Sequence, residues 1–132
     1  MLQIAFEKPF PLMMEVVEAD DRVPSMRVEM KVSSSQFQHS LKYHGMLWIG
    51  CLDFSKFIAA LNSSPVDALL KDMNGNFSLS VVGEGWIKTL SCELMKADVG
   101  GKKRVEAVFW AEVDDEVFQA IKNAFQQFPV WW

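Results

Sequence analysis

The stretch that decides the fold is GNFSLSVVGEGWIKTLSCELMKADVGGKKRVEAVFWAEV, residues 75–113. Apolar and polar residues alternate in three runs within it, and glycine-containing breaks at residues 83–85 and 98–102 separate the runs. Alternation with a period of two indicates half-buried strands, and short glycine breaks between such runs indicate hairpins. We therefore expect a three-strand antiparallel meander with one apolar face.

Two segments flanking this meander have a helical pattern instead. Residues 53–61 carry an apolar stripe at spacings of three and four, with Asp53 as a plausible N-cap, and the stripe comprises Phe54, Phe57, Ile58 and Leu61. Residues 114–128 open with three acids, which suit the positive end of a helix dipole, and Pro129 ends this segment. We also expect a short helical turn around VDALLKDM, residues 66–73.

The N-terminal part reads as strands. The runs LQIAF (2–6), LMMEVVE (12–18) and MRVEMKV (26–32) have strand length, and prolines separate the first two. Residues 33–45 fit either a further strand or an ordered excursion, and MLWIGCL (46–52) is a continuous apolar run of strand length.

These patterns predict a single α+β domain over residues 1–132. The expected architecture is an antiparallel twisted sheet of about six to seven strands, ending in the three-strand meander. A middle helix and a C-terminal helix would cover one face of this sheet.

Composition limits the class of protein. Half of the 132 residues are apolar and 23% are charged, which is enough to bury a core without disulfides. No apolar run approaches the roughly 20 residues that span a bilayer, and the start lacks a signal-peptide pattern, so we expect a cytoplasmic protein that does not bind membranes. The net charge of −4 disfavours nonspecific nucleic-acid binding and mildly favours a basic partner, although it is also ordinary for a soluble domain.

We looked for catalytic and metal-binding constellations. The two histidines, His39 and His44, lie five residues apart without a CxxC pair, so we expect no metal and no cofactor. Cys51 and Cys92 lie in apolar surroundings, where a buried thiol of raised pKa is expected rather than a nucleophile paired with a histidine. The sequence thus predicts a protein without catalytic activity.

The polar face of the meander is the candidate binding surface. If the alternation holds, it gathers acids and small hydroxyl residues around one tryptophan, a mixture typical of interfaces. The candidate partner-binding residues are Trp110, Glu106, Glu112 and Glu93. The alternative is that Trp110 is covered by loops of the same chain or by the terminal Trp131 and Trp132.

The order of these elements resembles the WapI-type immunity proteins, small bacterial proteins that neutralise toxic C-terminal domains of polymorphic toxins. The resemblance rests on GCLDFSKFIAAL (50–61), GNFSLSVVGEGWIKTLSCEL (75–94) and VEAVFWAEVDDEVFQAIKNAFQQF (105–128), about two thirds of the chain. It implies a compact cytoplasmic domain, without cofactor or catalysis, that sequesters a cognate toxin domain.

The leading hypothesis is therefore an immunity protein, monomeric or homodimeric, whose acidic surface suits a basic toxin domain. Two alternatives are open. One is a structural or regulatory module in which the exposed aromatic face closes a homodimer. The other is a small-molecule binder or cryptic enzyme with a pocket between sheet and helices, which would need polar groups converging in an apolar site.

Overall fold

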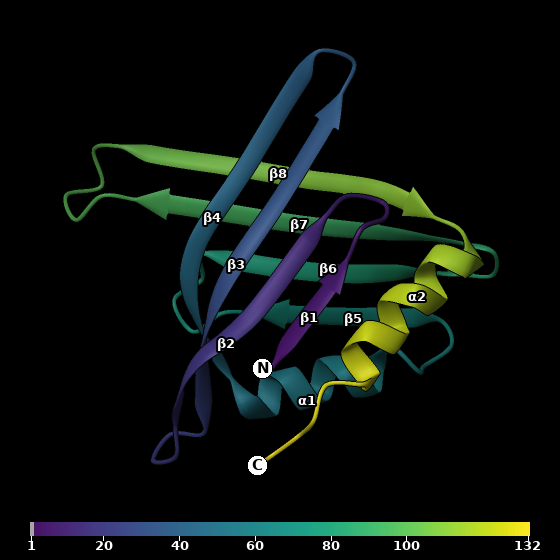
Figure 1. The fold of residues 1–132 in the computed structure, drawn as a ribbon, viewed down its shortest axis with the longest axis horizontal. Coiled ribbons are helices and arrows are strands. Elements are labelled where there is room, and N and C mark those ends of the chain that lie inside the picture. Colours follow the sequence, from purple (N-terminus) through teal and green to yellow (C-terminus); the bar gives the residue numbers. More distant parts are fainter. Residues whose placement is uncertain (1) are drawn as a thin grey trace.

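The computed structural model describes residues 2–132 and contains, within them, eight strands and two helices. The elements are β1 (Gln3–Phe6), β2 (Leu12–Asp20), β3 (Ser25–Gln36), β4 (His39–Gly50), α1 (Cys51–Ala60), β5 (Val66–Lys71), β6 (Phe77–Glu84), β7 (Ile87–Ala97), β8 (Arg104–Val113) and α2 (Asp115–Gln126). Four strands followed by one helix thus occur twice in succession (Figure 1).

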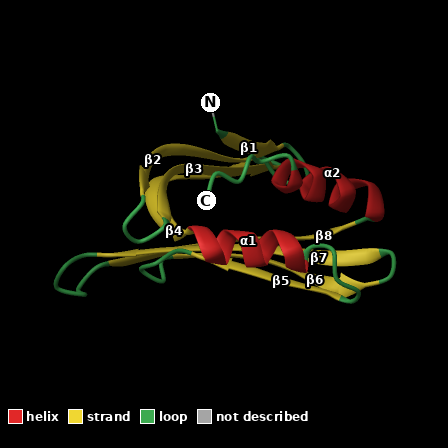
Figure 2. Cartoon of the chain, turned by 90° about the horizontal axis from the view of Figure 1, so that it is seen from below, coloured by secondary structure: helices red, strands yellow, loops and turns green. Residues whose placement is uncertain are grey.

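The strands form two separate four-stranded sheets, each antiparallel and each in simple chain order. The first sheet has the order β1-β2-β3-β4 and the second the order β5-β6-β7-β8. The two sheets lie face to face as two layers, and the strands of one run obliquely across those of the other (Figures 1 and 2). The fold is therefore a two-layer β-sandwich with helices at its side.

The core lies between the two layers because each sheet has one apolar face. In β3 the side chains of Met26, Val28, Met30 and Val32 are buried, and in β6 those of Phe77, Leu79 and Val81 are buried. Successive residues of a strand point to opposite faces, so this alternation leaves each sheet one face for the core and one for solvent. Apolar side chains of both sheets and both helices form one continuous buried cluster.

Each helix packs beside the first strand of a sheet. Helix α1 contacts β5, and helix α2 contacts β1 as well as the ends of β7 and β8. Phe54 of α1 meets Phe125 of α2 with ring centroids 6.0 Å apart, which joins the helices to each other. Strands β4 and β8 are the last strands of their sheets, so each has a neighbouring strand on one side only.

The α+β class, the antiparallel pairing and the β6-β7-β8 meander agree with the expectation from the sequence. The strand count and the helix positions differ, because residues 2–132 form eight strands in two sheets, and no helix pair in this part of the chain covers one face of a single sheet. The physical reason is that the two amphipathic sheets bury each other. Helices of 10 and 12 residues then only need to close the side of the sandwich.

Two local expectations are settled by the structure. Residues 33–45 continue β3 and β4 as one long hairpin, which turns at Phe37 and Gln38, with Phe37 at a φ of 55°. Residues 66–71 form strand β5 rather than a helical turn. The sequence VDALLK fits both periods over so short a run, and pairing with β6 decides in favour of the strand.

The two helix starts differ in how well the sequence indicates them. Helix α1 begins at Cys51, with Gly50 rather than Asp53 as its N-cap, so the predicted cap was wrong by three residues. Strand β4 passes into α1 without a loop, and Asp53 lies in the first helical turn instead. Asp114 is a true N-cap of α2, since its Oδ1 accepts a hydrogen bond from the Val117 N–H at 2.9 Å.

Neither helix of the described chain has the length and apolar character needed to cross a membrane.

Candidate functional site

The candidate site is the face of the second sheet that points away from the first sheet, which we call the outer face. The strand register arranges its side chains in cross-strand rows. Three of the rows are Lys71–Ser78–Glu93–Val108, Leu69–Ser80–Ser91–Trp110 and Asp67–Val82–Thr89–Glu112. Neither the first sheet nor a helix packs on this side of the sheet (Figure 2), so its centre is open to a partner.

The register brings all four candidate residues onto this face. Glu106, Trp110 and Glu112 alternate along β8, and Glu93 on β7 pairs with Val108, between Glu106 and Trp110. Each of the four side chains is exposed. The alternation in the sequence therefore located this cluster correctly.

Trp110 is 60% exposed, so it is not covered by the chain's own loops. The terminal tryptophans lie elsewhere. Trp132 meets Phe54 of α1 edge-on at 6.0 Å, and its Nε1–H donates a hydrogen bond to Ser55 Oγ at 2.8 Å. Trp131 packs on Trp132 at 4.8 Å. The terminal aromatics thus close the helical side of the core and leave Trp110 open.

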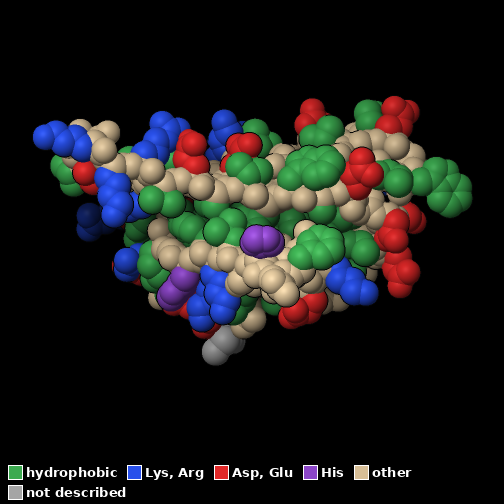
Figure 3. Space-filling model, turned by 90° about the horizontal axis from the view of Figure 1, so that it is seen from above, with side chains coloured by type: hydrophobic (Ala, Val, Ile, Leu, Met, Phe, Trp, Pro, Cys, Tyr) green, Lys and Arg blue, Asp and Glu red, His purple; other side chains and the backbone are tan. Residues whose placement is uncertain are grey.

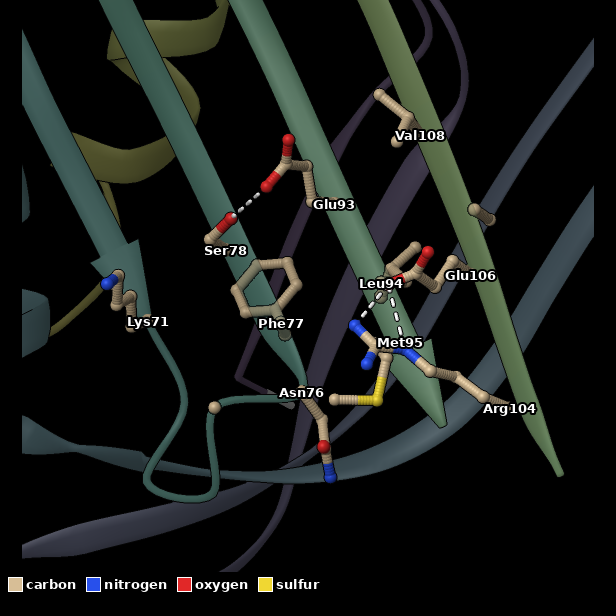
Figure 4. Close-up of a pocket in the computed structure, with 12 residues that line it drawn as sticks. Lys71, Asn76, Phe77, Ser78, Glu93, Leu94, Met95, Arg104, Glu106 and Val108 are labelled. Atoms are coloured by element: carbon tan, nitrogen blue, oxygen red, sulfur yellow. Dashed lines mark hydrogen bonds and ion pairs between the residues drawn. The ribbon is translucent and has the colours of Figure 1, made fainter. Parts of the chain in front are cut away.

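The charges of the outer face are unevenly compensated. Glu106 accepts hydrogen bonds from the Arg104 guanidinium, with its Oε1 2.9 Å from Nε, and Ser78 Oγ donates to Glu93 Oε2 at 3.5 Å (Figure 4). Glu112 forms no ion pair within the described part of the chain. Glu93 likewise forms no ion pair among the described residues, and the Ser78 hydroxyl does not cancel its charge. Uncompensated carboxylates therefore lie in the rows on both sides of Trp110.

A shallow depression of about 400 Å³ lies at the other end of the outer face (Figure 4). Its lining carries both signs of charge. Lys71 lies on β5, Glu93 on β7, and the paired Arg104 and Glu106 on β8. Mixed charges of this kind suit polar contacts at the rim of a protein interface.

Sequence reasoning missed part of the apolar content of this face. Leu69 is exposed in the Trp110 row and Val82 in the neighbouring Glu112 row, and Val108 is exposed two residues before Trp110 on β8. The alternation already placed Val82 and Val108 outward. Leu69 was missed because residues 66–73 were expected to form a helical turn, and a strand assignment would have placed it outward.

The cysteines lie in the core and the histidines on the surface. Burial raises the pKa of the Cys92 thiol to about 12, with a smaller contribution from the charge of Glu93, and burial also raises the pKa of Cys51. His44 lies on the first sheet, with Nε2 3.5 Å from Glu29 Oε2. Among residues 2–132, no group of three or more His, Cys, Asp or Glu side chains is placed to hold a metal ion.

Two buried charged residues have structural partners. Asp72 Oδ1 accepts the N–H groups of Asn76 and Phe77 at 2.8 and 3.0 Å, which fixes the turn between β5 and β6. Lys88 Nζ donates to the Gly85 carbonyl at 2.8 Å and lies 4.6 Å from the centre of the Phe118 ring. Lys88 therefore links the β6–β7 turn to α2.

No family model matches this sequence, and comparison with curated proteins and with solved structures likewise returns no match.

Proposed function

We propose that this protein is a non-catalytic immunity protein that works in the bacterial cytoplasm by binding and neutralising a cognate toxin domain. The observation that carries the proposal is the open outer face, where a 60% exposed tryptophan lies among acids and exposed aliphatic side chains. Large aromatic residues surrounded by polar groups are the usual energetic centres of protein interfaces. The resemblance of the element order to WapI-type immunity proteins supports the same function.

The charge of the face favours a basic partner. Glu112 lacks a compensating cation in the described structure, and the whole chain carries a net charge of −4. Complementary charge accelerates association, and salt screens it over about 8–10 Å at physiological ionic strength. A basic toxin domain would therefore bind faster at low salt, and Glu112→Gln would weaken that salt dependence.

Expression of the chain with the C-terminal domain encoded by its upstream neighbouring gene tests the proposal. We expect the domain to arrest growth alone, to be tolerated with this protein, and to co-purify with it. Trp110→Ala should weaken binding at least tenfold, as expected for a central interface aromatic. Trp86→Ala is the matched control, because Trp86 is 85% exposed on the β6–β7 turn, away from the centre of the face.

A neighbouring domain that is neither toxic nor bound would refute the proposal. Equal losses in the two tryptophan variants would place the contact elsewhere on the surface.

The exposed aliphatic residues around Trp110 also suit the alternative, a structural or regulatory module in which two copies pair through the outer face. Sedimentation distinguishes the two functions. A stable dimer that becomes a monomer in Trp110→Glu would favour the homodimeric module over the immunity protein.

A further inference from the structure

Strand β8 is an edge strand whose backbone is available on one side. It pairs with β7 over its whole length, from Lys88↔Val113 to Ala97↔Arg104. Beyond that pairing, no hydrogen bond in the described chain uses the backbone of residues 104–112. A long edge of this kind is a template for a further strand.

The register shows which residues carry the available groups. The β6–β7 hairpin has a two-residue turn, so its flanking pair Glu84↔Ile87 exchanges both backbone hydrogen bonds. Because hydrogen-bonding direction alternates along a strand, the even-numbered residues of β7 face β8. The Asp98 N–H donor to the Lys103 carbonyl agrees with this assignment. The free N–H and C=O groups of β8 therefore belong to Arg104, Glu106, Val108, Trp110 and Glu112.

The β3–β4 hairpin crosses β8 and extends over the space beside this edge (Figure 1). Some side chains at its tip point toward the second sheet, but that sheet ends at β8 and covers them only in part. Leu41 is 50% exposed there. Figure 3 looks onto this side and shows hydrophobic side chains in the hollow between the two layers.

A groove of about 300 Å³ occupies this space, between Val108–Ala111 of β8 and the hairpin. Its accessible apolar surface comes from Leu41 and the half-buried Ala111, because Phe10 and Phe109 are only 5% and 3% exposed. Gln36 and His39 of the hairpin contribute polar groups. A further strand beside β8 would direct alternate side chains into this groove. Its other side chains would lie on the outer face beside Trp110 and Glu112.

We infer that this groove binds an extended segment of a partner protein, which adds antiparallel to β8 as a fifth strand of the second sheet. The unpaired β8 edge supplies backbone hydrogen bonds, and the groove selects aliphatic side chains at alternate positions. Glu112 favours a lysine or arginine at an outward position. The inference concerns a different surface from the centre of the outer face, and it holds whether or not the partner is a toxin.

The test uses the full chain and the synthetic peptide acetyl-Lys-Val-Thr-Leu-Thr-Val-Lys-amide. Its valines and leucine match the groove, and its lysines and threonines match the outer face. In amide NMR spectra we expect saturable shifts at the even-numbered residues of β8 and at the hairpin tip, with slower hydrogen exchange at Glu106, Val108 and Trp110.

N-methylation provides the matched control. Methyl groups on the two threonine nitrogens block the N–H groups that face β8, so binding should weaken at least tenfold. Methyl groups on the two valine nitrogens point away from β8 and should leave affinity within about threefold. Equal effects of the two methylated peptides, or no shifts with the parent peptide at millimolar concentration, would overturn the inference.

A variant of the protein, rather than of the peptide, tests the contribution of the β8 backbone. Val108→Pro removes a free N–H without touching the pairing with β7, a position at which an edge strand tolerates proline. It should abolish peptide binding, whereas Val108→Thr should retain it. If Val108→Pro does not fold, the pair of methylated peptides still decides. A chain that is dimeric in sedimentation and occupies the groove with its own second copy would contradict a partner segment.

Discussion

Gly83 on β6 shows how a single residue constrains the sandwich. Its φ is +156°, and a Cβ at this position would lie 2.8 Å from the Lys88 Cα across the β6–β7 ladder. Backbone cannot yield as a flexible side chain can, so only glycine fits here without a shift of the hairpin.

We predict that Gly83→Ala lowers the free energy of unfolding by about 1–3 kcal/mol, the usual cost of a strained backbone position. Gly75→Ala is the control, since Gly75 also has a positive φ of 73° but no atom within 4 Å of a built Cβ. Urea denaturation measures both variants. A loss for Gly83→Ala no larger than for Gly75→Ala would show that the close approach to Lys88 costs nothing.

Cys92 gives the fold a sensitivity to alkaline pH. Its pKa is raised from 9.0 to about 12 by burial, so the folded state keeps the thiol proton where the unfolded state loses it. The unfolded state binds fewer protons between these values, and stability therefore falls as pH rises through this range. The contribution is fully present below about pH 9.

We predict that Cys92 adds a loss of up to about 1.4 kcal/mol per pH unit to the unfolding free energy above pH 9. Cys92→Ala should be less stable at pH 7 because of the cavity, but its stability should fall less steeply with pH. Denaturation curves at pH 7, 9 and 10 measure the slopes. Parallel slopes for the two proteins would contradict the assignment to Cys92.

At the scale of elements, the C-terminal residues after α2 connect the two helices. Phe128 and Trp132 pack on Phe54 of α1 at 5.1 and 6.0 Å, and Trp132 also donates its hydrogen bond to Ser55. This segment therefore stabilises the side of the sandwich where β1 and β5 are the edge strands.

We predict that Trp132→Phe, which keeps an aromatic ring but removes the indole N–H, costs about 1 kcal/mol of stability, as for a typical hydrogen bond. Ser55→Ala should cost a similar amount, and the double variant should cost less than the sum of the two. Thermal or urea unfolding of all four proteins gives the coupling energy. Strict additivity would mean that the hydrogen bond contributes nothing.

The candidate site was predictable to the extent that it depends on alternation. Trp110, Glu106 and Glu112 share one face because they are an even number of residues apart on one strand, and Glu93 joins them through a hairpin that the sequence indicates. Leu69 and the β8 groove were not predictable. Leu69 depends on strand β5, and the groove depends on how the β3–β4 hairpin crosses the second sheet.

At the scale of the whole molecule, the repeated order of four strands and a helix divides the chain into two halves that depend on each other. Each half forms one sheet, and the apolar face of each sheet is buried by the other sheet. A half alone would expose that entire face to water, which is unfavourable in proportion to its apolar area.

We predict that fragments 1–63 and 64–132, separated in the loop between α1 and β5, do not fold alone but recover the native circular dichroism when refolded together. The intact chain should unfold in one cooperative transition, since its core is continuous. Analytical refolding and thermal melts measure both outcomes. A cooperative melt for either fragment alone would show that its sheet is stable without the other.

The sequence by itself determined the α+β class, the C-terminal meander, both helices and the outward cluster around Trp110. These features follow from local periodicity, which requires no knowledge of distant contacts. Only the tertiary structure decided that the strands divide into two sheets, that residues 66–71 pair with β6 instead of turning as a helix, and that Trp110 stays uncovered. The reason is that alternation shows which side of a strand is apolar, while the surface that buries it is chosen by contacts between residues far apart in the chain.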